Sequence, residues 1–417
     1  MQESEKGRMG EWEDGSIPSP SPVLPFSPSS AAPFPSISLA ESPSNDAHSE
    51  ARRYQKAKLR ATLLALALNA FVLVFLALGG GPFLDDVFRG LVGDNRWLRL
   101  ILFGAVMAST AEIVGLPIDF WSGFMIEHRY GLSNQTLGRW IWRRIKSYLV
   151  IVPLGVVAVF AGYALIWYTG HWWWLWATAA WLGFTLVLGR LLPVLILPLF
   201  FPVSRLEDGP LVERLRHLIE GTGLHVEGVF RLDLSHVTRK ANAALAGMGR
   251  TRRVLLGDTL LREFTPEEIE VVFAHEVGHH VYRHLPKMLA IQVIFAAVGL
   301  FLADRVVNGL ADFLHYHGTA QLAAWQDPSA MSLFLLVLAI FTLINMPILN
   351  AISRAFERQC DRYALKRTGL TSAYRSAFQK LAVLNKVDPD PPWPVVWFLE
   401  DHPPLRERLA MADLPLS

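Results

Sequence analysis

The chain has 417 residues, of which 52% are hydrophobic and only 18% are charged, and its formal net charge at pH 7 is +2. This composition is too apolar for an ordinary soluble protein and indicates several membrane spans, while the nearly neutral charge argues against nucleic acid as a partner. The single cysteine, Cys360, excludes an intrachain disulfide and a thiolate-rich metal site.

The N-terminal segment, residues 1–55, is rich in proline and serine, and it has neither the apolar core nor the cleavage site of a secretory signal peptide. Such a segment buries too little apolar surface to offset the entropy that is lost on ordering, so we expect a disordered tail. A passive extension is favoured over a docking tail, which stays the alternative.

Six apolar segments are long enough to cross a bilayer as helices. They cover approximately residues 61–80, 97–118, 148–168, 172–201, 288–306 and 331–352. The sequence therefore predicts a mainly α-helical, polytopic membrane protein with six to seven spans. We expect an N-terminal membrane domain over residues 56–203 with four spans, and a second domain over residues 204–417 that contains the last two.

The basic residues orient these spans. Lys and Arg are concentrated before the first span, between the second and third, and after the sixth, and they are sparse in the opposite loops. The positive-inside rule then predicts that both termini and the soluble stretch 202–286 are cytoplasmic. In a bacterium the membrane would be the inner, or plasma, membrane.

Residues 240–245 are predicted to form an extended edge, followed by a glycine-containing turn and a strand over 253–256, in a small β-hairpin or sheet. A substrate peptide could add to such an edge as an extra strand, held by Asn242 and Ala243. Asn242 could instead only close a local turn.

The run His275-Glu276-Val277-Gly278-His279 predicts a zinc site on a helix. His275 and His279 are one turn apart on the same face, so both can bind one ion, and Glu276 would lie beside the open coordination position as general base. Thr265 and Pro266 are typical of the start of this helix. The alternative is a helix that carries these residues by coincidence.

Two histidines leave the site one protein ligand short. A metzincin would supply a third histidine six residues after His279, but that position is Leu285, and His284 is expected on a different helix face. A gluzincin takes a glutamate from a later helix. Glu357 and Asp361 are spaced i, i+4, so Glu357 is the predicted third ligand of one Zn²⁺ per chain.

Asp361 is then expected to accept the second ring N–H of a ligating histidine. The alternative for this segment is a surface helix with Arg–Glu pairs, since Arg354 and Arg358 flank Glu357. Cys360 is expected to be a small buried hydrophobic residue rather than a competing ligand.

Four separate stretches give the chain a specific resemblance. They are Gly115–Pro117 with Phe124–Glu127 and Gly131–Thr136; Asn242–Ala243 with Gly247–Gly249 and Arg253–Leu261; the zinc helix with Ser353–Asp361; and His402–Leu409. Because these stretches follow one another in the same order as in the integral-membrane zinc CAAX prenyl proteases (type I), the chain resembles that family. The members of this family are gluzincin metallopeptidases. The resemblance implies a membrane-embedded endopeptidase with a water-filled chamber, acting on peptide or protein substrates that are prenylated or membrane-linked.

The resemblance also indicates His402, with Arg408 in the same motif, as donors to the oxyanion of the reaction. The alternative for His402 is a packing role, with the side chain made rigid by the two prolines that follow it. Two other functions stay open: a zinc protease for quality control of membrane proteins, and a non-catalytic membrane scaffold with structural zinc. Glu276 argues against the scaffold, because a structural site needs no base. The chain departs from the family in Cys360, in its six spans against seven, and in its proline-rich tail.

Overall fold

A computed structural model describes residues 45–415, apart from the side chains of Asn45 and Arg250. Residues 1–44 of the predicted tail lie outside the described residues. The remainder of that tail, residues 45–55, is helical, because α1 (Asn45–Phe75) begins at Asn45. Ala51 and Tyr54 of this early part are 6% and 2% exposed, so packing orders a segment whose composition predicts disorder.

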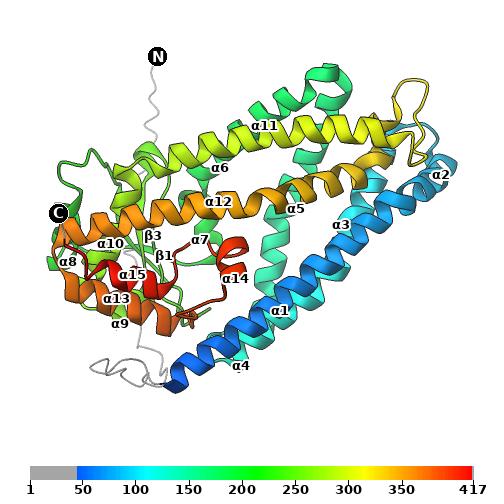
Figure 1. The fold of residues 1–417 in the computed structure, drawn as a ribbon. Coiled ribbons are helices and arrows are strands. Elements are labelled where there is room, and N and C mark those ends of the chain that lie inside the picture. Colours follow the sequence, from blue (N-terminus) through cyan, green and yellow to red (C-terminus); the bar gives the residue numbers. More distant parts are fainter. Residues whose placement is uncertain (1–44, 416–417) are drawn as a thin grey trace, which may run out of the picture. The chain divides into compact units, whose positions relative to one another are not determined.

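Five continuous helical stretches of the described chain are long and apolar enough to cross a membrane. In chain order their main helices are α1 with the π-helix η1 (Leu76–Gly80) and α2 (Gly81–Val92); α3 (Arg96–Phe120) with η2 (Trp121–Ile126) and α4 (Glu127–Arg129); α5 (Leu137–Thr169) to α6 (Trp173–Leu191) and α7 (Leu197–Phe200); α11 (His284–Ala311); and α12 (Met331–Thr368) (Figure 1).

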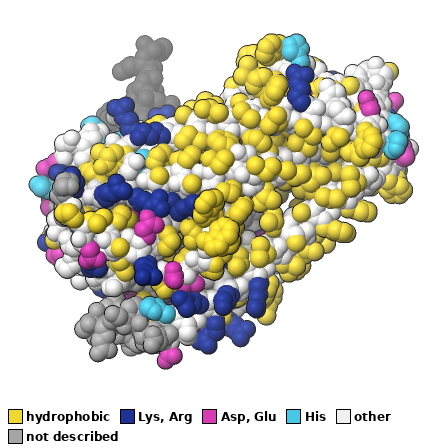
Figure 2. All heavy atoms as spheres, viewed as in Figure 1, with side chains coloured by type: hydrophobic (Ala, Val, Ile, Leu, Met, Phe, Trp, Pro, Cys, Tyr) yellow, Lys and Arg dark blue, Asp and Glu magenta, His cyan; other side chains and the backbone are white. Residues whose placement is uncertain are grey.

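The third stretch contains two of the six predicted spans. The chain turns between α5 and α6 at Gly170, whose φ of 57° suits a residue without a side chain. All six predicted segments are therefore helical. Their surfaces carry apolar side chains such as Phe71, Ile113 and Leu149, which are 68%, 74% and 68% exposed, as a lipid-facing surface requires (Figure 2).

A four-stranded sheet forms the β part of the second half. Its strands are β1 (Val203–Arg205), β2 (Gly228–Leu232), β3 (Ala243–Ala246) and β4 (Arg253–Gly257), in the order β1-β2-β4-β3. β2 and β4 are parallel, and β3 pairs antiparallel with β4, with Ala243 opposite Leu256. The predicted hairpin is thus confirmed, and β3 is an edge strand of this sheet.

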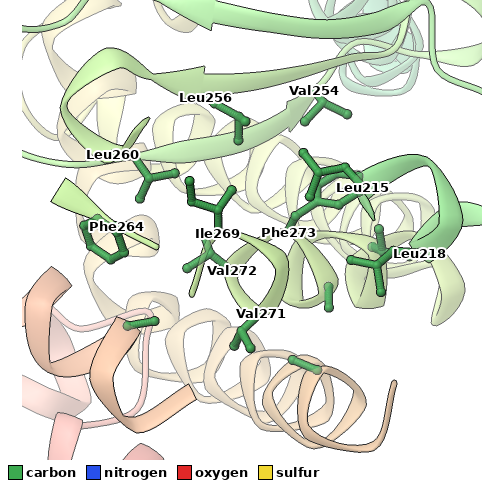
Figure 3. Close-up of a cluster of buried hydrophobic side chains, with 14 of the residues drawn as sticks. Leu215, Leu218, Val254, Leu256, Leu260, Phe264, Ile269, Val271, Val272 and Phe273 are labelled. Atoms are coloured by element: carbon green, nitrogen blue, oxygen red, sulfur yellow. The ribbon is translucent and has the colours of Figure 1, made fainter. Parts of the chain in front are cut away.

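The zinc helix is α10 (Pro266–Val281). Thr265 accepts a hydrogen bond from the backbone N–H of Glu268, and the Glu268 carboxylate accepts one from the Thr265 backbone in return, which defines where the helix begins. One face of α10 packs under the sheet through buried apolar side chains. They include Ile269, Val271, Val272 and Phe273 with Val254, Leu256, Leu260 and Leu215 (α8, Pro210–Ile219) (Figure 3).

The second half ends in α13 (Thr371–Leu384), α14 (Trp393–Phe398) and α15 (Leu405–Met411), and α9 (Asp258–Glu263) precedes α10. α12 is one helix of 38 residues. Its first part is apolar, and its last turns, which include Glu357 and Asp361, are buried against the hydrophobic core of the second half. One continuous helix therefore connects a membrane-capable segment directly to the candidate site.

Candidate metal centre

Two histidines of α10 face one carboxylate of α12. Nε2 of His275 lies 3.2 Å from Oε2 of Glu357, and Nε2 of His279 lies 3.2 Å from Oε1. His275 and Glu357 are only 6% and 5% exposed. The residues that the sequence predicts as ligands thus converge, although they come from two helices far apart in the chain.

These residues fit a metal ion. Ligands held about 2.0–2.2 Å from a tetrahedral zinc are roughly 3.3–3.5 Å apart, close to the two N–O separations found here. In addition, Oε2 of Glu357 is buried and accepts no hydrogen bond within the described residues, although His275 lies beside it. A buried carboxylate oxygen without a donor is costly, and a cation bound between the three residues would remove this cost.

Asp361 lies one turn beyond Glu357 and orients the first histidine. Nδ1 of His275 donates to Oδ1 of Asp361 over 2.9 Å, so Nε2 is left facing Glu357. Burial alone would lower the pKa of His275, but the hydrogen bond to Asp361 and the neighbouring carboxylate of Glu357 outweigh it and raise this pKa to about 9. The surroundings of the ring therefore favour a cation strongly.

Arg408 of α15 holds Asp361. Its guanidinium donates to both carboxylate oxygens, with Nε–Oδ2 of 2.9 Å and Nη2–Oδ1 of 2.6 Å, and it lies 3.9 Å from the ring centroid of Phe378. Nη2 of Arg408 is 3.9 Å from Oε2 of Glu357. The predicted residue is at the site, and its strongest contacts are with Asp361.

Glu276 lies where two cavities meet. It lines a cavity of about 1120 Å³ together with His279, His280 and Leu245, and also a smaller one of about 350 Å³ together with His275. A carboxylate that opens onto two accessible spaces can reach a water molecule and a substrate. A closed structural site would have no such access.

The edge strand runs beside both cavities. Asn242 and Ala243 line the smaller one, and Leu245 and Gly247 line the larger one. Gly247 has φ of 94°, and a Cβ there would lie 2.3 Å from the carbonyl oxygen of Thr251, so only glycine fits this turn. The Asn242 side chain is exposed and makes no hydrogen bond within the described residues, which disfavours the alternative of a local turn.

His402 approaches the centre from the loop between α14 and α15. Its Nε2 lies 3.4 Å from Oε2 of Glu357, and its Nδ1 lies 2.7 Å from Oδ1 of Asp401. The hydrogen bond with Asp401 raises the pKa of His402. The side chain is 52% exposed, which argues against the packing role that is its alternative.

The sequence missed a contact behind the second histidine. His284 was expected to face elsewhere, and this is wrong: its Nδ1 lies 3.2 Å from Nδ1 of His279. The expectation assumes an unbroken helix, but α10 ends at Val281 and Arg283 adopts a left-handed conformation with φ of 55°. The reversal turns His284, the first residue of α11, back towards the site.

Cys360 joins this contact from α12. It is fully buried, its Sγ lies 3.4 Å from Nδ1 of His284, and a Cβ on Gly278 would lie 3.2 Å from the same sulfur. Ligand atoms of His275, His279 and Cys360 also lie within 4.8 Å of one another, so the thiol is an alternative third ligand. We favour Glu357, because both Nε2 atoms face it and the sulfur contacts His284.

Membrane-capable helices joined to a buried His–His–Glu centre define the class of integral-membrane metallopeptidases. The chain belongs to peptidase family M48, whose profile matches residues 205–415. Residues 30–201 match the family model of the CAAX prenyl protease N-terminal region. That region has five membrane helices in the family, one more than the four spans that the sequence predicts there. The chain is therefore a metalloprotease, a hydrolase, of the membrane.

Relatives extend over most of the chain. It is 30% identical over 322 residues to the uncharacterized metalloprotease YhfN of Bacillus subtilis, and this match covers 76% of the present chain and 74% of YhfN. It is 30% identical over 330 residues to a CAAX prenyl protease 1 homolog of Arabidopsis thaliana, a match that covers 78% of this chain and 76% of the homolog. It is 27% identical over 335 residues to CAAX prenyl protease 1 of Saccharomyces cerevisiae, a match that covers 75% of this chain and 72% of the yeast protein.

A solved structure has the same fold. The crystal structure of S. mikatae Ste24p matches with a TM-score of 0.74 at 24% identity, and the match covers 89% of each chain. The predicted fold class, a polytopic helical membrane protein with a small β-containing peptidase domain, is confirmed.

Proposed function

We propose that the chain is a zinc-dependent endopeptidase in which His275, His279 and Glu357 hold one Zn²⁺ and Glu276 is the general base. The observation that carries this proposal is that the Nε2 atoms of both histidines lie 3.2 Å from the two oxygens of one buried carboxylate. This assignment uses both histidines and also the Oε2 atom of Glu357, which accepts no hydrogen bond within the described residues.

Zinc, when bound, lowers the pKa of a water molecule and polarises the scissile carbonyl. The residues of the chain do the rest. The Glu276 carboxylate takes the proton of the attacking water and passes it to the nitrogen of the leaving amine. Nε2 of His402, on the side of Glu357 that faces the smaller cavity, donates to the oxyanion as it develops.

Asp361 and Arg408 keep the site in this geometry. Asp361 accepts the Nδ1–H of His275, which fixes the tautomer whose Nε2 lone pair is free for the metal. Arg408 neutralises Asp361 and orients it through two hydrogen bonds. In this role Arg408 is a positioning residue. Because it also lines the smaller cavity, it could contact the substrate as well.

The substrate peptide would bind as an extra strand along β3. The side of β3 that does not pair with β4 offers backbone groups to an extended peptide, and the Asn242 amide and the Ala243 backbone would hold it. The first residue of β3 lines the smaller cavity, and Leu245 near its other end lines the larger one. A peptide bound along β3 would therefore extend from one cavity into the other and pass Glu276, which lines both cavities. Cleavage inside a chain, rather than at one end of a closed pocket, follows from this arrangement.

For the substrate, we favour C-terminal tails of prenylated or otherwise membrane-linked peptides. Support comes from the relatives named CAAX prenyl proteases and from the membrane-capable helix α12, which continues into the site. We place the site on the cytoplasmic side, on the distribution of Lys and Arg. We assign a membrane domain to residues 56–203 and a peptidase domain to residues 204–417; the boundary between the two family matches, at residues 201–205, supports this assignment.

Cleavage of farnesylated and unprenylated copies of one peptide by the detergent-solubilised full chain tests the function. We expect cleavage that is lost with 1,10-phenanthroline, restored by Zn²⁺, and faster for the farnesylated peptide. Equal rates would favour quality-control cleavage of membrane proteins. Full activity after verified removal of zinc would refute the zinc mechanism.

A further inference from the structure

A second candidate binding site lies at the N-terminal end of α1, away from the metal centre. It is a cavity of about 430 Å³ whose charged lining consists of four cations and no acid: Arg53, Lys56, Arg60 and Arg129. Figure 2 shows dark blue side chains gathered over this end of α1. The volume is in the range of about 300–1,000 Å³ that ligand pockets occupy.

The positions of these residues follow from helix geometry. Arg53, Lys56 and Arg60 are spaced i, i+3, i+7, so they project from one face of α1. The opposite wall is formed by η2 and α4, and Arg129 lies at its end. Two helices thus direct cations into one space, which a row of basic residues on a single solvated helix does not do.

The described part of the chain does not neutralise the cations of the cavity. Arg53 contacts the Ser49 hydroxyl over 3.5 Å, and none of the four forms an ion pair within the described residues. The nearby acid, Glu127, is already paired: its carboxylate lies 3.2 Å from Nζ of Lys58 and 3.0 Å from Nζ of Lys240. A bound anion would therefore compensate four positive charges that have no acidic partner within residues 45–415.

The rest of the wall is apolar and firmly packed. Trp121 and Tyr130 pack against a buried cluster that contains Tyr54 and Ile126, and the rings of Tyr54 and Tyr130 contact edge to face at 5.3 Å. Met125, on the same wall, is 52% exposed. The cavity therefore combines a cationic side with an apolar side, which suits an amphipathic anion.

The cavity also lies at the level where two spans end. The predicted apolar run of α1 begins directly after Arg60, and that of the second span ends shortly before Trp121. Lys240, which pairs with Glu127 beside the cavity, precedes the substrate-edge strand β3. In a membrane crossed by these two spans, the cavity would lie at the level of the lipid headgroups, on the side on which we place the peptidase domain.

We propose that this cavity binds the anionic headgroup of a phospholipid, with the phosphate between Arg53, Lys56, Arg60 and Arg129 and the start of the acyl chain against Trp121 and Met125. The lipid would fix the end of α1 against η2 and α4. This site does not depend on the zinc mechanism and would exist in an inactive protein as well.

Titration of the detergent-solubilised full chain with phosphatidylglycerol, followed by native mass spectrometry, tests the proposal. We expect tighter binding of phosphatidylglycerol than of phosphatidylcholine with the same acyl chains. Each charge near a membrane surface contributes about fivefold to affinity, so R53Q/K56Q/R60Q is expected to weaken binding about 100-fold.

The matched control is R139Q/K287Q/R362Q, which removes three exposed cations outside the cavity and is expected to bind as the wild type does. Circular dichroism and gel filtration check that both variants fold. Equal losses in the two variants, or equal binding of the two lipids, would overturn the proposal. Displacement of the lipid by equimolar inorganic phosphate would also overturn it, since the site would then be one for free phosphate.

Discussion

Nδ1 of His275 lies 2.9 Å from Oδ1 of Asp361, although 86 residues separate the two in the sequence. This contact joins α10 to α12 and determines which nitrogen of His275 faces Glu357. Because α12 is also a candidate membrane span, the candidate metal centre is assembled only when this span docks on the peptidase core. Folding in the membrane and formation of the site are therefore coupled.

The variant Glu276→Gln is expected to lose activity and keep the metal. The amide has the same shape but cannot accept the proton of water, so kcat should fall by about 10²–10⁴-fold. Quenched-fluorescence peptide cleavage gives the rate, and elemental analysis gives the zinc content. Wild-type activity in this variant would exclude Glu276 as the base.

The variant Glu357→Ala is expected to lose zinc, because only two protein ligands remain. Cys360→Ala is the matched control: it removes the alternative ligand on the same helix and is expected to retain zinc with only a modest loss of stability. Competition with a fluorescent chelator measures both affinities. The reverse result, loss of zinc in Cys360→Ala alone, would assign the metal to the thiol.

The variant Asp361→Asn is expected to bind zinc about 10–100-fold more weakly, since it loses the charge that orients His275 and holds Arg408. Asp312→Asn, an exposed acid elsewhere in the chain, controls for the change in net charge. The Co²⁺-substituted protein should show a shifted visible spectrum for Asp361→Asn only. Identical spectra and affinities would limit Asp361 to a packing role.

The variant His402→Ala is expected to lower kcat by about 10²–10³-fold with little change in KM, as for the loss of one oxyanion donor. Because the side chain is half exposed, thermal unfolding should shift little. A large loss of stability with unchanged kcat would instead support a packing role for His402 before the two prolines.

Asp258 gives a prediction for pH dependence. It is 4% exposed, and its Oδ1 accepts backbone hydrogen bonds from Leu234 (2.8 Å) and Ser235 (3.0 Å). Burial would raise its pKa, but these bonds and the charge of Arg262 lower it below 3.8 in the folded protein. The unfolded chain then binds the proton more readily, so the stability from Asp258 is present above about pH 4 and is lost as pH falls through the folded pKa.

Asp258→Asn should therefore destabilise the zinc-free protein by about 1–3 kcal/mol at pH 7. Denaturant unfolding in detergent between pH 7 and pH 3 measures the difference from the wild type, which should narrow at the acid end. A difference that stays constant over this range would show that the charge of Asp258 contributes nothing.

The features that the sequence predicted best are local. The one-turn spacing of His275 and His279, the cap at Thr265, and the shared face of Glu357 and Asp361 all follow from the 3.6-residue period, and helix formation preserves them wherever the helix lies. The spans were equally clear, because their composition alone makes them membrane segments.

Features that depend on how segments end or pack were missed. The early start of α1 depends on contacts of Ala51 and Tyr54, which their local composition does not reveal. The return of His284 to His279 depends on the left-handed turn at Arg283, which no preference of arginine predicts.

By itself, the sequence determined which groups this protein has for chemistry: two histidines and a glutamate on one helix, a carboxylate pair on another, and helices apolar enough for a membrane. The tertiary structure decided which partners meet. Packing between distant segments brings α10 to α12, pairs Arg408 with Asp361, and places Glu276 in the walls of two cavities. Periodicity describes one element at a time, whereas these contacts are fixed only when all the elements share one core.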